Sequence, residues 1–557
     1  MKKYHTLLVV LIAIGFVALL TWFIPITYLS NGSELIAGEK VRAGLVGVTS
    51  YSLFTFYNFI YVFVYLLFVG GLYGLLNNCS AYRVLLDKIV KHVKNHKILY
   101  LITTVLLISV IVSFTGYTFE ALIFLPFIAS IVLLLGYDKI TAAMVTVGSI
   151  STGVIGSIFS KIIAGKINSV LESTTYTDYI IPKIIVLVLS CALLIGYIIY
   201  YAKNKSVKEN IEEGFLVPKK VTSKNVKVWP LVTILSVFVL FFALAGIDWQ
   251  GAFKVDFFAD TLKTVLSWSL LSKYVILTVC GLAIILLVLT SFIKMKKSSK
   301  KDEVFMSKRR KIVTIVLGVI AFLALLKIML EDVFKVTDFM NKALVAIKVD
   351  SLVSDLTFGN ILGTVAAFGS WTYNEYLILI MIIMLAIKFA YRIKMKDVFE
   401  NVGDGVKKVL YGALVVLLSY TVLILVSSHP IGLTILHNKI YTLLNTNGLN
   451  ILTYPLATLI SALFNSDFAY YEYGVLNASF AAAAYTGSGV LPFAEFITQT
   501  MYGFAMYFAP TSVILLFTLS LLDIKYTTWL KKMWLYLLII LVVIILVYLG
   551  IYFNIIV

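Results

Sequence analysis

The sequence predicts an all-α polytopic membrane protein built as an inverted repeat, with two re-entrant hairpins, two broken helices and about 11 spans. The 557 residues are 61% hydrophobic, with a mean hydropathy of +0.99. A soluble chain of this size would not keep so much apolar surface from aggregating. Two matching polar breaks also occur in the two halves of the chain, and the strongly basic loops all fall on one side of the resulting topology.

The two matching breaks lie at 113–126 (SFTGYTFEALIFLP) and 464–477 (FNSDFAYYEYGVLN). Each carries one or two carboxylates between apolar runs of roughly 15 residues, which is short of the about 20 that a spanning helix needs. Two short runs joined by a polar break predict a hairpin that enters the membrane and returns to the same side. Such a tip is stable only if it is buried in protein or lines a wet cavity. We expect these hairpins over 98–135 and 451–485.

Each hairpin is followed by an apolar segment with its own polar break, SISTGVIGSIFS at 149–160 and YFAPTS at 507–512. We expect broken helices over 141–164 and 496–521. Interrupted segments at corresponding places in two halves indicate the binding site of a transporter. The candidate substrate-binding residues at the tips and breaks are Glu120, Thr118, Ser149, Ser151, Thr152, Gly153, Gly156, Ser157, Asp467, Glu472, Pro510, Thr511 and Ser512.

The first repeat covers 1–202. A retained first helix is predicted at 6–26, followed by a polar loop at 27–50 and a second span at about 53–76. The segment 80–97 has apolar residues on one face and basic residues on the other, which is typical of a helix lying in the membrane interface. Its positive charge marks the cytoplasmic side. After the hairpin and the broken helix comes a span at about 179–201.

The middle of the chain separates the repeats. Residues 203–310 form basic, cytoplasmic loops around two inserted spans, at about 228–245 and 274–293. Residues 311–408 hold connecting spans at 312–330 and 376–389, an external segment at 331–371 and a basic loop at 391–408.

The second repeat covers 409–557 and echoes the first, but it starts outside. A span at about 409–426 leads to a nearly uncharged amphipathic segment at 431–448, then to the second hairpin, the second broken helix and a last span at 533–552. We therefore expect a multi-pass protein of the cell membrane with a cytoplasmic N-terminus and an external C-terminus.

Several classes of function are excluded by the sequence. The net charge of +18 is concentrated in a few loops, so it indicates topology rather than nucleic-acid binding. The three cysteines have no paired spacing, so we expect no disulfide and no metal site. No Walker motif, paired zinc ligands or nucleophile elbow occurs, so we expect no enzyme, no cofactor and no ATP drive.

Four motifs carry a family resemblance. FVGGLYGLL followed by a basic amphipathic stretch, GYTFEALIFLP with LLLGYD, and the late APTS and TTWLKKMW resemble the YfcC-like branch of the anaerobic C4-dicarboxylate carrier family, in the ion transporter superfamily. The likeness covers about 5–202 and 310–555. It implies a substrate held between hairpin tips and helix breaks, and uptake or exchange of carboxylates or amino acids. It also implies frequent ion coupling and homodimers that move like an elevator.

The chain departs from that family at the expected sodium ligands. The Asn-Pro of the first break corresponds to Ser160 and Lys161, and the Asn before the second break to Met506. A thioether is a poor ligand for a hard cation, which prefers oxygen. Carboxylates at both tips can carry a proton in a partly dry site. We therefore expect coupling to protons or to a counter-substrate rather than to sodium.

Each candidate residue also has a plain structural interpretation. A carboxylate inside the membrane is a functional hypothesis by default, but Glu120, Asp467 and Glu472 would be simply solvated if the tips reach the headgroups. The Ser, Thr and Gly residues at the breaks suit ordinary close helix packing as well as a site. Lys161 suits either a counter-charge to a substrate carboxylate or a snorkelling side chain.

The leading hypothesis is a secondary transporter of a small amino acid or carboxylate, and the tip acids favour an amino acid. One alternative is a membrane protein that handles glycans or lipids, which would expose a large polar loop with clustered Asp, Glu, His or Arg. The external segment 331–371 contains neither His nor Arg. The other alternative is a non-transport membrane subunit with degenerate carrier motifs. Proteoliposome uptake distinguishes both alternatives from a transporter.

Overall fold

The computed structural model describes residues 4–24, 27–30, 34–37, 42–158, 160, 180–204, 213–218, 226–246, 371, 373–429, 453–464 and 491–553. The chain divides into two compact units. Unit 1 joins Met1–Val226 to Tyr391–Val557, and unit 2 is Lys227–Ala390.

The described part of the chain contains seven helical segments that are long and apolar enough to cross a membrane. They are α1 (His5–Phe23), α2 (Leu45–Asn78), the run Ser80–Thr115, α9 (Ile180–Asn204), α16 (Tyr373–Tyr391), α17 (Met395–Ser428) and α24 (Tyr526–Tyr552). Polytopic, almost entirely helical architecture is therefore confirmed.

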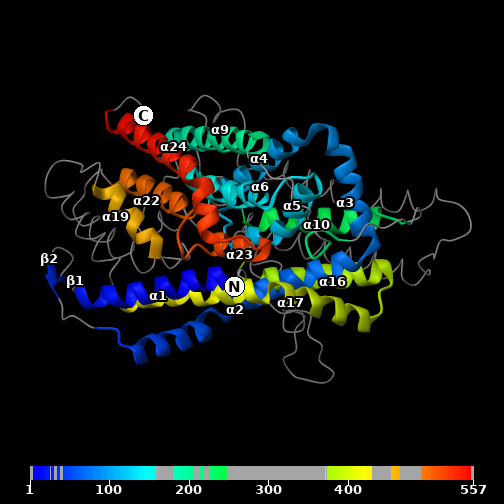
Figure 1. The fold of residues 1–557 in the computed structure, drawn as a ribbon, viewed down its shortest axis with the longest axis horizontal. Helices are drawn as coiled ribbons and strands as arrows, with labels where there is room; N and C mark the ends of the chain where they lie inside the picture. The colour runs from blue at the N-terminus through cyan, green and yellow to red at the C-terminus, as the bar shows by residue number, and fades with distance from the viewer. Residues whose placement is uncertain are drawn as a thin grey trace, which may run out of the picture. The chain divides into compact units, whose positions relative to one another are not determined.

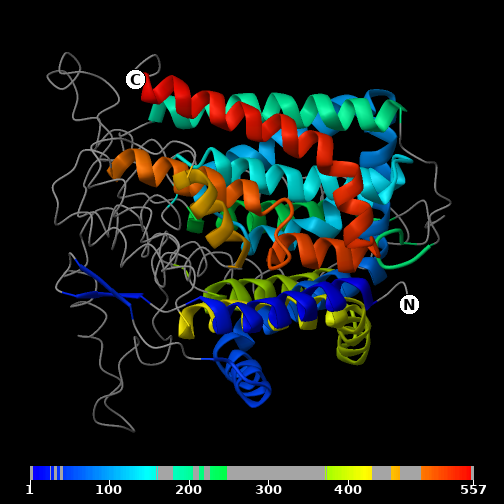
Figure 2. The same cartoon turned by 60° about the vertical axis from the view of Figure 1, so that its left-hand side comes forward.

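In unit 1, α1, α2 and α17 lie together, and α9 runs beside α24 away from them (Figures 1 and 2). α2 and α17 approach to backbone contact. A Cβ atom added at Gly74 would lie 2.2 Å from the carbonyl oxygen of Asn401 and 2.7 Å from Cα of Gly405. Only glycine allows two long helices to cross this closely.

The first hairpin forms as predicted. After α3 (Ser80–Val93) and a short 3₁₀ turn (Lys94–His96), α4 (Lys97–Thr115) leads to a tip, to the 3₁₀ turn η3 (Glu120–Phe124) and to α5 (Leu125–Leu134). Gly116 ends α4 in the left-handed conformation (φ 71°), where glycine is favoured, and this reverses the chain. At the open end, Nζ of Lys97 donates to the carbonyl oxygen of Leu135 (2.6 Å) and so ties the two arms together.

The second broken helix is present with both halves, and the first is described up to its break. In the first, α6 (Lys139–Ala143) runs through a π-helical turn (Met144–Gly148) into α7 (Ser149–Ile155), which ends at Gly156. In the second, α22 (Leu491–Ala505) and α23 (Val513–Leu522) are separated by the non-helical residues 506–512. The chain thus leaves the helical path at 156–157 and 506–512, within both predicted segments.

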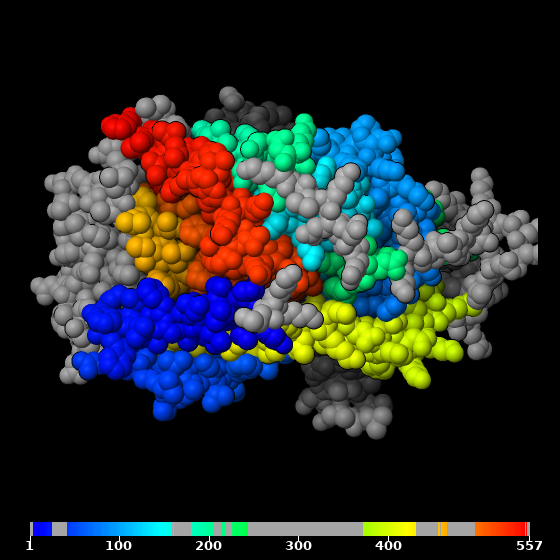
Figure 3. All heavy atoms as spheres, viewed as in Figure 1, coloured from blue at the N-terminus to red at the C-terminus, as the bar shows by residue number. Residues whose placement is uncertain are grey.

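Corresponding elements of the two halves pack on each other: α2 on α17, α7 on α22, and α9 on α24. The first arm of each hairpin also packs on the broken helix of its own half, α4 on α7 and α19 (Thr453–Phe464) on α22. These pairings are those that an inverted repeat produces. Figure 3 shows α1 on the surface of unit 1, next to the orange and red atoms of the second broken helix and α24.

Unit 2 has two described helices, α10 (Trp229–Gly246) and α16. The rings of Phe242 and Tyr376 lie 5.2 Å apart between centroids and join them. Both helices match predicted spans.

Three features differ from the prediction. β1 (Thr27–Ser30) and β2 (Glu34–Ala37) pair antiparallel where a polar loop was expected. α17 begins at Met395, inside the expected basic loop, because the charges there occupy one face while Val398 and Gly405 are buried. α24 likewise begins at Tyr526, seven residues before the expected start of the last span at 533, because Trp529 and Met533 on one face are fully buried.

Some predictions lie outside the described residues. These are the second hairpin beyond Phe464, the amphipathic segment 431–448, the spans at 274–293 and 312–330, and nearly all of the segment 331–371.

Candidate functional site

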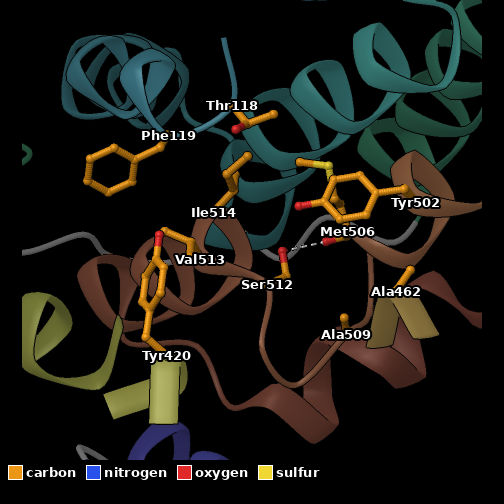
Figure 4. A pocket seen from close by; sticks show the side chains of 10 residues that line it. All are labelled: Thr118, Phe119, Tyr420, Ala462, Tyr502, Met506, Ala509, Ser512, Val513 and Ile514. Carbon is orange, nitrogen blue, oxygen red and sulfur yellow. Dashed lines mark hydrogen bonds between the residues drawn. The ribbon is translucent and has the colours of Figure 1, made fainter. Parts of the chain in front are cut away.

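A hollow lies where the first hairpin tip meets the second helix break (Figure 4). The empty space in it, counted with the open solvent at its mouth, is about 390 Å³, of which about 20 Å³ admits the centre of a water molecule. Elements from both repeats form it. The lining residues are Thr118, Phe119, Tyr420, Ala462, Tyr502, Met506, Ala509, Ser512, Val513 and Ile514.

Two tyrosines of α2 hold the hairpin tip in place. The hydroxyl of Tyr65 donates to the carbonyl oxygen of Glu120, and that of Tyr73 donates to the carbonyl oxygen of Ile123, each over 2.8 Å. The ring of Tyr65 also packs on Phe119, with centroids 4.9 Å apart. These contacts bury the tip inside the protein, as the hairpin prediction requires.

Ser512 shapes the second break. Its Oγ donates to the carbonyl oxygen of Met506 (2.9 Å) and accepts from the backbone N–H of Leu515 (3.5 Å), so the side chain caps α23. Val513 and Ile514, the first two residues of α23, line the hollow. The first N–H groups of a helix have no partner within the helix and carry partial positive charge, so this end of α23 suits an anion.

The lining is uncharged and mostly apolar, with hydroxyl groups at a few positions. Four of the lining side chains carry hydroxyl groups, those of Thr118, Tyr420, Tyr502 and Ser512, and none of the lining residues is acidic or basic. Tyr420 comes from α17, where its ring packs 4.3 Å from that of Phe59 between centroids. The hollow can therefore offer hydrogen bonds and a helix N-terminus to a small anion.

The two helix breaks lie against each other beside this hollow. The hydroxyl group of Tyr507 donates to the carbonyl oxygen of Gly148 (2.9 Å) and lies 2.6 Å from Oγ1 of Thr152 and 2.8 Å from the hydroxyl of Tyr536. All four residues are buried. Segments about 350 residues apart in the chain thus meet through side-chain hydrogen bonds, as the inverted repeat predicts.

The structure separates the predicted site residues into three groups. Thr118 and Ser512 line the hollow, and Glu120, Pro510 and Thr511 are their neighbours in the chain. Glu120 itself is buried (8% exposed) but does not line the hollow. Asp467 and Glu472 lie outside the described residues.

The third group lies in α7 and at its end, away from the lining. Thr152 bonds Tyr507, whereas Gly153 packs on α4, where an added Cβ would lie 2.7 Å from the carbonyl oxygen of Ser109. Gly156 packs in the same way on Leu187 of α9. Ser149, Ser151 and Ser157 are fully buried between these helices.

Sequence reasoning did not single out Tyr420, Tyr502 or Gln499 as site residues. Tyr420 belongs to α17, which looked like an ordinary span. Gln499 is the one amide side chain in the run FITQTMYGFA of α22, and a lone amide in an apolar helix is the signal that identifies it.

The first hairpin, the described arm α19 of the second, the two helix breaks and the hollow beside them have the arrangement of an inverted-repeat secondary transporter. A family profile described as C4-dicarboxylate anaerobic carrier (DcuC) matches residues 3–366, more than half of the chain. The protein belongs to this carrier family.

A solved structure that resembles the chain is that of the Alcanivorax borkumensis YdaH transporter, whose description notes an unusual topology. It is 11% identical, covers 99% of this chain and 98% of its own, and superposes with a TM-score of 0.36. No curated protein matches the sequence.

Proposed function

We propose that the protein carries a small carboxylate across the cell membrane, bound in the hollow between the first hairpin tip and the second helix break. The observation that carries this proposal is the N-terminus of α23, where Ser512, Val513 and Ile514 line the hollow. The description of the family as C4-dicarboxylate carriers supports the same class of substrate.

The uncharged lining favours a carboxylate over a basic amino acid. The sequence pointed to an amino acid because of acidic tip residues, but Glu120 lies outside the lining. Hydroxyl donors and a helix N-terminus stabilise an anion. A cationic side chain would find no carboxylate among the described lining residues.

Transport proceeds by proton coupling or exchange in this proposal. Glu120 carries a buried carboxyl group and directly follows Thr118 and Phe119, which line the hollow. A movement of the hairpin tip on substrate release would therefore alter the access of this carboxyl group to water. In this proposal the N-terminus is cytoplasmic and the C-terminus is external, which the basic loops on one side of the topology support. The homodimer that the family resemblance implies is tested by light scattering of the purified protein.

The test is uptake of radiolabelled succinate, malate, aspartate and lysine into proteoliposomes. We expect the dicarboxylates to enter and lysine to be excluded. Ser512→Ala removes the cap that shapes the lined end of α23, a cap being worth about 1 kcal/mol of helix stability. We expect the half-saturation concentration to rise roughly fivefold, the factor to which about 1 kcal/mol corresponds if the end of α23 must be re-formed to bind the ligand. The matched control is Thr421→Val. It removes the buried hydroxyl group of the residue that follows Tyr420, and Thr421 itself does not line the hollow.

Two outcomes would contradict the proposal. One is lysine uptake without uptake of any dicarboxylate. The other is an unchanged half-saturation concentration in Ser512→Ala.

A further inference from the structure

The first broken helix ends with carbonyl groups that need donors. The last carbonyls of any helix have no N–H partner within it, and a buried one left unpaired is costly. α7 ends at Ile155, and Val154, Gly156 and Ser157 are all buried. The backbone N–H of Ser157 donates to the carbonyl oxygen of Val154 (3.2 Å), so it is the carbonyl oxygens of Gly156 and Ser157 that need partners from elsewhere in the protein.

Two side chains supply those partners. The amide nitrogen Nε2 of Gln499 donates to the carbonyl oxygen of Ser157 (2.8 Å) and lies 3.5 Å from that of Val154. Oγ of Ser113, at the end of the first hairpin arm, donates to the carbonyl oxygen of Gly156 (2.5 Å). Gln499 and Ser113 are both fully buried.

The orientation of the Gln499 amide is fixed by its neighbours. Both atoms that face it are carbonyl oxygens, which only accept, so the NH₂ end must point at them. Its Oε1 is buried and has no hydrogen-bond partner among the described residues. The side chain thus places its positive, donating end at the negative end of the α7 dipole.

Like the amide NH₂ group, a cation suits the C-terminal end of a helix, where carbonyl oxygens carry partial negative charge. Unwound carbonyls and the C-terminal ends of half-helices coordinate ions in transporters. An ion and the amide exclude each other here because the amide nitrogen, 2.8 Å from the Ser157 oxygen and 3.5 Å from the Val154 oxygen, fills the space between these oxygens that an ion would take.

We propose that the amide of Gln499, with the hydroxyl of Ser113, occupies the position that a cation would take at the first break. Gln499 is then a positioning residue from the second repeat that keeps the first break formed without a bound ion. The uptake part of the test rests on the proposed transport function. The proposal also predicts how sodium affects the unfolding temperature of the purified protein, and that measurement requires no transport.

The test replaces the donor in two ways. Gln499→Glu puts a carboxyl group against the same carbonyl oxygens, and when ionised it repels them unless a cation intervenes; the comparison is therefore made at alkaline pH, where a proton competes least with the cation. Gln499→Met has a similar size but neither donates nor carries charge. Thermal unfolding and carboxylate uptake are measured for both variants and for the wild type, in sodium and in choline salts of equal ionic strength.

We expect the wild type to unfold at the same temperature and to transport at the same rate in both salts. In choline, the uptake rate of Gln499→Glu should be about tenfold lower than that of the wild type, because the free energy of one buried hydrogen bond corresponds to about that factor. In sodium, the uptake rate of this variant should recover in large part. Its unfolding temperature should rise with sodium. Gln499→Met should be impaired equally in both salts.

Three results would overturn the inference: a wild type that needs sodium for uptake, a wild type that sodium stabilises, or a Gln499→Glu variant that responds to sodium no more than Gln499→Met does. The wild-type measurements decide the matter even if a variant fails to fold. A protein that transports no carboxylate but shows the expected unfolding pattern would contradict the proposed function alone.

Discussion

The crossing of α2 and α17 gives a prediction about stability. Gly405→Ala adds a methyl group whose carbon would lie 2.1 Å from the carbonyl oxygen of Gly70 and 2.7 Å from Cα of Gly74. Ordinary contacts begin at about 3.4 Å, so one helix must move by about 1 Å over a backbone that has no flexible side chain to displace. Overpacking of this kind costs about 1–3 kcal/mol, against a gain of up to about 1 kcal/mol in helix propensity.

The matched control is Gly403→Ala on the same helix, where an added Cβ meets nothing within 4 Å. Gly403→Ala gains helix propensity without a steric clash, so it should leave the unfolding temperature unchanged or raise it. Thermal unfolding of the purified proteins in one detergent, followed by intrinsic fluorescence, compares the two variants. Equal unfolding temperatures for Gly405→Ala and Gly403→Ala would refute the close crossing of these helices.

Two further predictions concern coupling and the contact between the breaks. Glu120→Gln should abolish accumulation driven by a pH gradient and leave exchange partly intact. Uptake that follows a sodium gradient at fixed pH, and is the same in Glu120→Gln, would contradict this. Tyr507→Phe removes a hydroxyl bonded to Gly148, Thr152 and Tyr536, so it should destabilise the protein by about 1–3 kcal/mol in thermal or denaturant unfolding. A stability equal to that of the wild type would show that these bonds do not hold the breaks together.

The sequence was sufficient for the helical architecture because each spanning helix is encoded locally, as an apolar run of the right length. It failed where a charged segment is still helical. In the segment that begins α17, Asp397 and Lys407 face outward while Val398 and Val409 are buried, so the charges suggested a loop although the helical period was present. The pairing of β1 with β2 was missed because each strand is only four residues long and lies in a segment with many polar residues.

The candidate site was predicted less completely for a different reason. The polar residues at the breaks were visible as interruptions of apolar runs, and Thr118 and Ser512 do line the hollow. Which hydroxyl faces the hollow and which bonds a neighbouring helix depends on contacts between residues hundreds of positions apart. No local pattern distinguishes Tyr420, which lines the hollow, from Tyr507, which bonds the other break.

The bond between Gln499 and the first break also has a consequence for biogenesis. The donor lies 342 residues after the acceptor, Ser157. At about 5–20 residues per second, a ribosome needs roughly 20–70 s to cover that distance. During this interval the carbonyl oxygen of Ser157 lacks its donor, whereas that of Gly156 already has Ser113. A nascent chain stopped before α22 therefore has a first half in which one end of the broken helix is still incomplete.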